Sequence, residues 1–120
     1  MVKLVVLLRS GARTLAYTEN YNEFLMKLEE LPGLRRKAVS TVYGATGGAV
    51  PFSHIIEVYF DSREAMEAAL TSPAGVEAGR ILRQFAGPDA VNLFADTFEE
   101  SYPYAGEEES PLTRDDSSAP

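Results

Sequence analysis

The sequence predicts an α+β protein with a ferredoxin-like, split βαβ fold, in which a four-stranded antiparallel sheet carries helices on one face. The first observation is the order of apolar segments along the 120-residue chain, which runs strand, helix, strand, strand, helix, strand. The second is the length, which suits one domain with one modest core. The third is a change of composition. Residues 1–100 form the expected domain, whereas residues 101–120 are rich in Ser, Pro and acidic residues and predict a flexible tail.

The first half of this pattern predicts a strand, a helix and a second strand. Residues 2–9 are apolar or β-branched at nearly every position, as in a strand covered on both faces. Pro32 and Gly33 mark the end of a helix, and residues 34–43 predict the next strand. The helix itself is predicted by apolar residues at positions i, i+3, i+4 and i+7, namely Tyr21, Phe24, Leu25 and Leu28.

The second half predicts two more strands with a helical region between them. Residues 54–60 alternate along the chain, which indicates a strand with one face in the core. Asp61 followed by Glu64 predicts a capping box at the start of a short helix. A second helical piece spans about residues 74–85, and residues 90–98 predict the last strand.

Composition excludes several classes of function. With 11 Lys and Arg against 18 Asp and Glu, the net charge of −7 argues against a nucleic-acid surface. The chain has no cysteine and one histidine, His54, so thiolate clusters and multi-histidine metal sites are excluded, and we expect no metal and no cofactor. The longest N-terminal apolar run, residues 4–8, is too short for a transmembrane helix or a secretory signal. We therefore expect a cytoplasmic protein without a membrane partner.

Two of the predicted strands indicate that the protein pairs with itself. Residues 2–9 and 90–98 are apolar on both faces, but helices cover only one face of such a sheet. A large apolar sheet face does not stay in water. Its burial against a second copy of the chain predicts a homodimer.

Three residues are candidates for proton transfer. His54 is the one side chain that ordinarily titrates near neutral pH, although a surface or hydrogen-bonding role at a strand edge is the simpler interpretation. Glu57 and Tyr59 share the face opposite the expected core, so Glu57 would point into the dimer interior. A carboxylate there would have a raised pKa or an ion-pair partner, for which Arg9 is the candidate. A cross-strand or inter-subunit salt bridge is the simpler interpretation of Glu57.

A second group predicts a pocket for a small hydrophobic molecule. Tyr17, Tyr21 and Phe24 lie on the first helix and its entry loop, where aromatic side chains suit a hydrophobic ring. Core packing is the simpler interpretation of Tyr21 and Phe24. Asn92 and Asp96 share one face of the last strand and are candidates for the same pocket, although the polarity of an edge strand explains them equally well.

Several motifs of the chain resemble the EthD family over about residues 1–100. Each motif alone is only a strand, a turn or a helix cap, and their order and spacing carry the resemblance. Two of them resemble the opening of the family, namely Met1-Val2-Lys3-Leu4-Val5-Val6-Leu7 and Leu31-Pro32-Gly33-Leu34-Arg35-Arg36. Three others resemble its central signature, namely Phe60-Asp61-Ser62-Arg63-Glu64-Ala65, Ala68-Ala69-Leu70 and Ser72-Pro73-Ala74-Gly75.

The resemblance implies a dimeric α/β barrel, in which two ferredoxin-like sheets pack face to face. Many members carry a histidine in the first helix where this chain has Phe24, and a proline where it has Met26. Two functions stay open. The first is a homodimer that binds a small hydrophobic molecule or accompanies a catabolic or biosynthetic enzyme. The second is a cofactor-independent enzyme, of isomerase, cyclase or monooxygenase type, that acts on a hydrophobic, aromatic or polyketide-like substrate.

Overall fold

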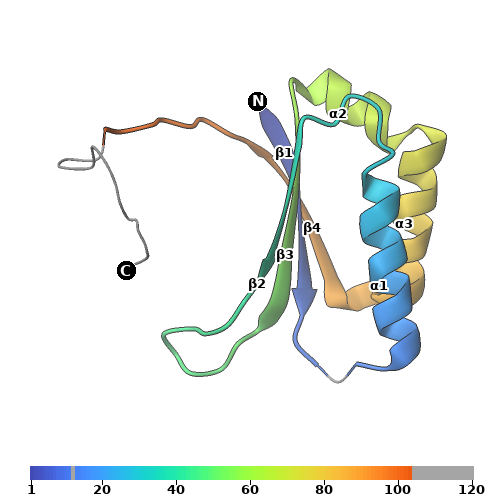
Figure 1. Ribbon diagram of the computed structural model, residues 1–120, viewed down its shortest axis with the longest axis vertical. Coiled ribbons are helices and arrows are strands. Elements are labelled where there is room, and N and C mark those ends of the chain that lie inside the picture. The colour runs from blue at the N-terminus through green and yellow to red at the C-terminus, as the bar shows by residue number, and fades with distance from the viewer. Residues whose placement is uncertain (12, 104–120) are drawn as a thin grey trace.

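The computed structural model describes residues 1–11 and 13–103, and its elements follow the predicted order (Figure 1). The predicted tail falls mostly on residues 104–120, which lie outside the described residues. The strands are β1 (Val2–Arg9), β2 (Arg36–Thr41), β3 (Phe52–Phe60) and β4 (Ala90–Asp96). The helices are α1 (Leu15–Leu28), α2 (Arg63–Leu70) and α3 (Pro73–Phe85), and a short 3₁₀ turn spans Gly87–Asp89.

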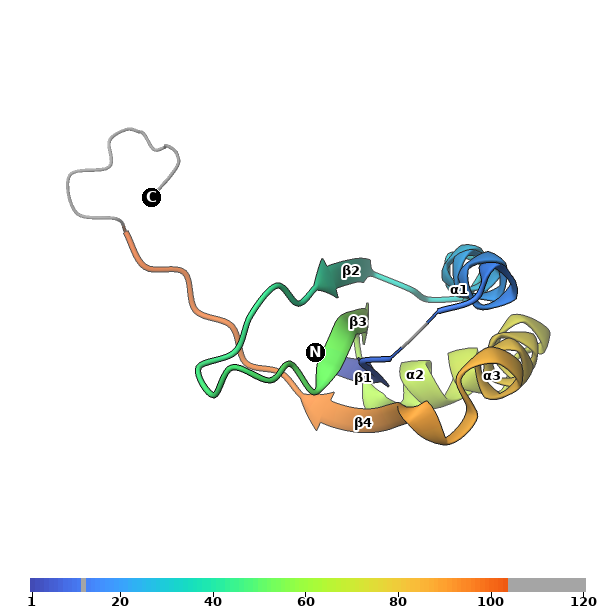
Figure 2. The same cartoon turned by 90° about the horizontal axis from the view of Figure 1, so that it is seen from below.

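The four strands form one antiparallel sheet in the order β2-β3-β1-β4. The three helices lie on one face of this sheet, so the described chain has two layers (Figures 1 and 2). The predicted α+β, ferredoxin-like fold is therefore confirmed. Within the described part of the chain, no helix combines the length and the apolar character that crossing a membrane requires.

The core lies between the sheet and the helices because alternate residues of the two central strands point to that side. In β1 every second residue from Val2 to Leu8 is buried, and β3 places Ile56, Val58 and Phe60 beside them. The helices complete the core with buried side chains from α1, α2 and α3, among them Phe24, Leu28, Met66, Ile81 and Leu82.

Several element boundaries differ from the prediction. The N-cap of α2 is Ser62, whose Oγ accepts a hydrogen bond from the backbone N–H of Ala65 at 3.1 Å. Asp61 lies one residue too early for this role, and its carboxylate pairs with Arg35 at 3.3 Å instead. Strand β2 is shorter than residues 34–43, although backbone hydrogen bonds to β3 continue just beyond its ends, from the N–H groups of Arg35 and Val42.

We call the sheet face away from the helices the open face, and no other helix or strand of residues 1–11 and 13–103 covers it (Figure 2). Alternation places Val5 and Leu7 of β1 on it, and the register sets Leu93 and Val91 of β4 directly beside them. The Leu93 side chain is 48% exposed. This is the apolar face that predicted self-association.

Candidate functional site

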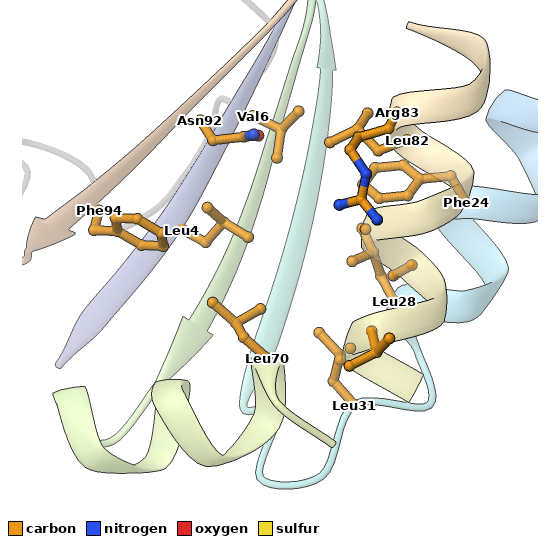
Figure 3. A pocket seen from close by; sticks show the side chains of 14 residues that line it. Leu4, Val6, Phe24, Leu28, Leu31, Leu70, Leu82, Arg83, Asn92 and Phe94 are labelled. Carbon is orange, nitrogen blue, oxygen red and sulfur yellow. The ribbon is translucent and has the colours of Figure 1, made fainter. Parts of the chain in front are cut away.

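A cavity of about 340 Å³ opens between the helix side of the sheet and helix α3, and we call it the apolar pocket (Figure 3). Side chains of the sheet, including Leu4, Val6 and Phe94, face side chains of the helices across it (Figure 3). Most of the lining is apolar, and its other large side chains are Phe24, Leu28, Leu31, Leu70, Val76 and Leu82.

Three small residues of α3 form part of the helix wall of the apolar pocket. Gly75, Ala78 and Gly79, which are spaced at i, i+3 and i+4, all line the pocket. Leu4 and Val6 of β1 line the same cavity from the sheet. Strand β4 is an edge strand with one neighbour in the sheet, and its pocket residue Phe94 is 65% exposed.

Two polar side chains belong to the apolar pocket, Asn92 from β4 and Arg83 from α3. Both residues are exposed, whereas Val6, Phe24 and Leu28 in the same lining are buried. The pocket therefore has an apolar interior, and its exposed mouth combines these two polar groups with Phe94 and Val76. Such an arrangement suits an apolar ligand that carries a polar group at one end.

The residues predicted for a pocket separate into two groups in the structure. Phe24 and Asn92 line the apolar pocket. Asp96 does not, because its carboxylate is held by Arg63, 3.2 Å from Nε, and this hydrogen bond lowers the pKa of Asp96. Sequence reasoning missed Arg83 as a lining residue. The sequence signal that could have identified the helix wall of the pocket is the i, i+3, i+4 spacing of small residues on α3.

Tyr17 and Tyr21 belong to an aromatic cluster next to the apolar pocket. The ring of Phe85 lies 5.0 Å from Tyr17, 6.4 Å from Tyr21 and 5.9 Å from Phe24. Burial raises the pKa of both tyrosines, so both are neutral at pH 7. The Tyr17 hydroxyl is buried and has no hydrogen-bond partner among the described residues.

His54 lies at the edge of this cluster, on the helix side of the sheet. Its ring lies 5.0 Å from the ring of Tyr21, and its Nδ1 lies 2.9 Å from Ser53 Oγ. The guanidinium of Arg13 donates a hydrogen bond to the same Ser53 hydroxyl. Burial, and secondly repulsion from Arg13, lowers the pKa of His54, so the imidazole is neutral at pH 7.

Because His54 is the single histidine of the chain, its titration can be followed by one NMR resonance. We expect the titration midpoint of His54 to lie below the ordinary pKa of 6.5. In Arg13→Gln the midpoint should rise, because this variant removes the repulsion from the Arg13 charge and leaves the burial. Neutral His54 contributes stability that is present above pH 6.5 and is lost as the pH falls through the lower folded pKa. A midpoint at or above 6.5 in the native protein would contradict the assignment.

Glu57 and Tyr59 lie on the open face, away from both the apolar pocket and His54. The prediction that Arg9 pairs with Glu57 is wrong: Lys3 Nζ lies 2.8 Å from Glu57 Oε2. The register explains this, since Lys3 is set beside Tyr59 and diagonal to Glu57, whereas Arg9 pairs with Phe52 further along the strands. The hydrogen bond to Glu57 raises the pKa of Lys3.

Comparison with solved structures identifies what this chain is similar to. An EthD (ethyl tert-butyl ether D) family protein from Bacillus halodurans has a TM-score of 0.76 at 27% identity, over 82% of this chain and 99% of that one. The resemblance to the EthD family that the sequence motifs predict is thus confirmed. No family model and no curated protein matches the chain.

More distant structures share the fold. A dimeric ferredoxin-like protein of unknown function from Jannaschia sp. CCS1 has a TM-score of 0.66 at 16% identity, over 80% of this chain and 98% of that one. A variant of SnoaB, a cofactor-independent oxygenase from Streptomyces nogalater, has a TM-score of 0.62 at 14% identity, over 86% and 97%. At such identities the likeness concerns the fold and not the chemistry.

Proposed function

We propose that this EthD-like chain forms a homodimer that binds a small hydrophobic molecule in the apolar pocket. The observation that carries the proposal is a cavity of about 340 Å³ with an apolar interior and two polar groups at its mouth. Pockets of a few hundred Å³ with apolar walls and few polar groups are typical small-molecule sites. In this role the protein would store the molecule, or accompany a catabolic or biosynthetic enzyme that makes or uses it. Its cytoplasmic location stays a prediction from the sequence.

The homodimer is supported by the open face. Val5, Leu7, Val91 and Leu93 form an apolar surface on which the described residues leave Leu93 exposed and the other three partly exposed. Proteins of the same fold include dimeric ones. Because the apolar pocket lies on the opposite side of the sheet, pairing through the open face leaves the pocket accessible.

Binding can be tested with 1-octanol as a neutral apolar probe, titrated into ¹⁵N-labelled protein and followed by NMR. We expect shifts of the backbone amides that line the pocket, such as Gly79 and Phe94. Val76→Trp places a large ring at the pocket wall, at a side chain that is 61% exposed, so it fills space at little cost in stability. We expect this variant to bind octanol about tenfold more weakly or worse, because the indole ring takes space that the octanol chain would otherwise fill and bury.

The matched control is Leu15→Trp, which adds the same ring at a 74% exposed leucine of α1 outside the pocket lining. Its octanol affinity should equal that of the unmodified protein. Native mass spectrometry of gently purified protein reports the subunit number and any retained molecule together. Octanol shifts scattered over the surface, or equal affinities of the two variants, would contradict the proposal.

A second candidate function is a cofactor-independent enzyme with His54 as the proton acceptor. The observation that favours it is a neutral imidazole whose Nδ1 lies 2.9 Å from Ser53 Oγ, beside the ring of Tyr21. The aromatic cluster connects this histidine with the apolar pocket, because Phe85 contacts both Tyr21 and the pocket residue Phe24.

Catalysis by His54 can be tested directly. A molecule retained by the purified protein would be incubated with the unmodified protein and with His54→Gln, and the mixtures compared by chromatography. Conversion by the unmodified protein alone supports the enzyme. Unchanged material in both samples supports binding without catalysis.

A further inference from the structure

Arg83 differs from the other basic side chains that the structure describes. Seven Lys and Arg side chains in residues 1–11 and 13–103 form ion pairs, namely Lys3, Lys27, Arg35, Arg36, Lys37, Arg63 and Arg80. Arg9 lies over the ring of Phe52, and Arg13 donates to Ser53. For Arg83, these described residues supply no carboxylate, hydrogen-bond or aromatic partner, although it lies on the wall of the apolar pocket.

The side chain of Arg83 extends back along α3 toward the start of the helix, as long helical side chains do. Its Nη1 lies 3.4 Å from where a Cβ atom of Gly79 would be, one turn earlier on the same helix. Gly79 also lines the apolar pocket. The guanidinium therefore lies along the pocket wall, and Figure 3 shows it on the helix side of the pocket.

Asn92 is the other polar side chain of the pocket, and it comes from the opposite wall. In Figure 3 it projects from β4 beside Val6, facing the helix wall that carries Arg83. A ligand group at the mouth can thus meet a guanidinium from one side and a carboxamide from the other. The guanidinium offers only donors, and its planar fork matches the two oxygens of a carboxylate.

We infer that the ligand of the apolar pocket is a monocarboxylate with a hydrophobic body, whose carboxylate is held by Arg83 at the mouth with a further hydrogen bond from the Asn92 amide. This inference rests on the proposed binding function and specifies its ligand class. The buried lining takes the apolar body, because Val6, Phe24 and Leu28 offer it no polar partner. The carboxylate stays at the exposed mouth, where it loses only part of its hydration. A charge-assisted hydrogen bond from Arg83 offsets this loss.

Octanoate and 1-octanol test the inference because they share the eight-carbon chain and differ in the charged end. At pH 7 and low salt, NMR titrations should show octanoate binding about tenfold more tightly than octanol, as expected of a hydrogen bond to a charged group. Arg83→Gln should remove this preference, because it weakens octanoate binding much more than octanol binding. Arg83→Lys should restore part of it, since the charge returns without the planar fork.

The matched control is Arg80→Gln, three residues earlier on α3, where the guanidinium already pairs with Glu77. This variant should keep the full preference for octanoate. Equal binding of octanoate and octanol by the unmodified protein, or a preference that survives in Arg83→Gln, would overturn the ligand class and leave the proposed binding function standing. Failure of both compounds to bind would overturn both.

Discussion

Replacing Gly75 with alanine is expected to reduce the free energy of unfolding by about 3 kcal/mol, near the upper end of typical overpacking costs. A Cβ atom at this position would lie 2.3 Å from the carbonyl oxygen of Ala69 and 2.5 Å from that of Leu70. These are backbone atoms at the end of α2, so no flexible side chain can move aside. Gly75 therefore allows α3 to start directly against α2, and the variant must separate the two helices.

Urea denaturation followed by circular dichroism measures the change in the free energy of unfolding. In thermal unfolding the melting temperature should fall by more than 10 °C, since about 1 kcal/mol corresponds to roughly 4–8 °C in a domain of this size. The matched control is Gly79→Ala, one turn later in the same helix. There the nearest atom to a new Cβ is the flexible Arg83 Nη1 at 3.4 Å, and alanine has the higher helix propensity. We expect Gly79→Ala to equal or exceed the unmodified protein in stability. A Gly75→Ala protein as stable as this control would refute the close contact.

Replacing Leu93 with lysine is expected to dissociate the proposed homodimer. Leu93 lies on the open face beside Val5, so pairing of two open faces would bury one new ammonium group per chain. A buried charge without a partner costs several kcal/mol, and each 1.4 kcal/mol raises a dissociation constant tenfold. We expect an increase of at least about a hundredfold. Sedimentation equilibrium over a range of protein concentrations measures the change.

Leu15→Lys is the control for this experiment, since it adds the same charge at an exposed leucine of α1 on the helix side of the molecule. It should leave the dissociation constant unchanged, and both variants should keep the circular dichroism spectrum of the native fold. The dimer proposal fails if the unmodified protein is a monomer at tens of micromolar. Dimerisation through another surface is indicated if Leu93→Lys associates as tightly as the control.

The sequence predicted the fold well because the relevant signals are local. Alternation along residues 54–60 correctly assigned Glu57 and Tyr59 to the face opposite the core, since the side-chain period of a strand is two. The helix cap was wrong by one residue because Asp61 and Ser62 are both good caps, and the backbone path at the end of β3 decides between them.

The candidate site was predicted only in part. Phe24 and Asn92 were identified from their residue types and line the apolar pocket, but Tyr17 and Tyr21 pack in the neighbouring aromatic cluster. Arg83 was missed because a basic residue in the last turn of a helix usually stays in solvent near the helix dipole. Arg83 differs from the other described basic residues because it lines the pocket and has no partner side chain among the described residues, and both features depend on the tertiary structure.

The sequence by itself determined the order of the elements, the faces of the central strands and the uncovered apolar face, because hydrophobic periodicity acts within a few residues. Only the tertiary structure decided which distant residues meet. The register sets Lys3 diagonally to Glu57, and the strand order sets β4 beside β1, so that Asn92 faces Arg83 across the pocket. Such pairings follow from packing between elements, which no local pattern specifies.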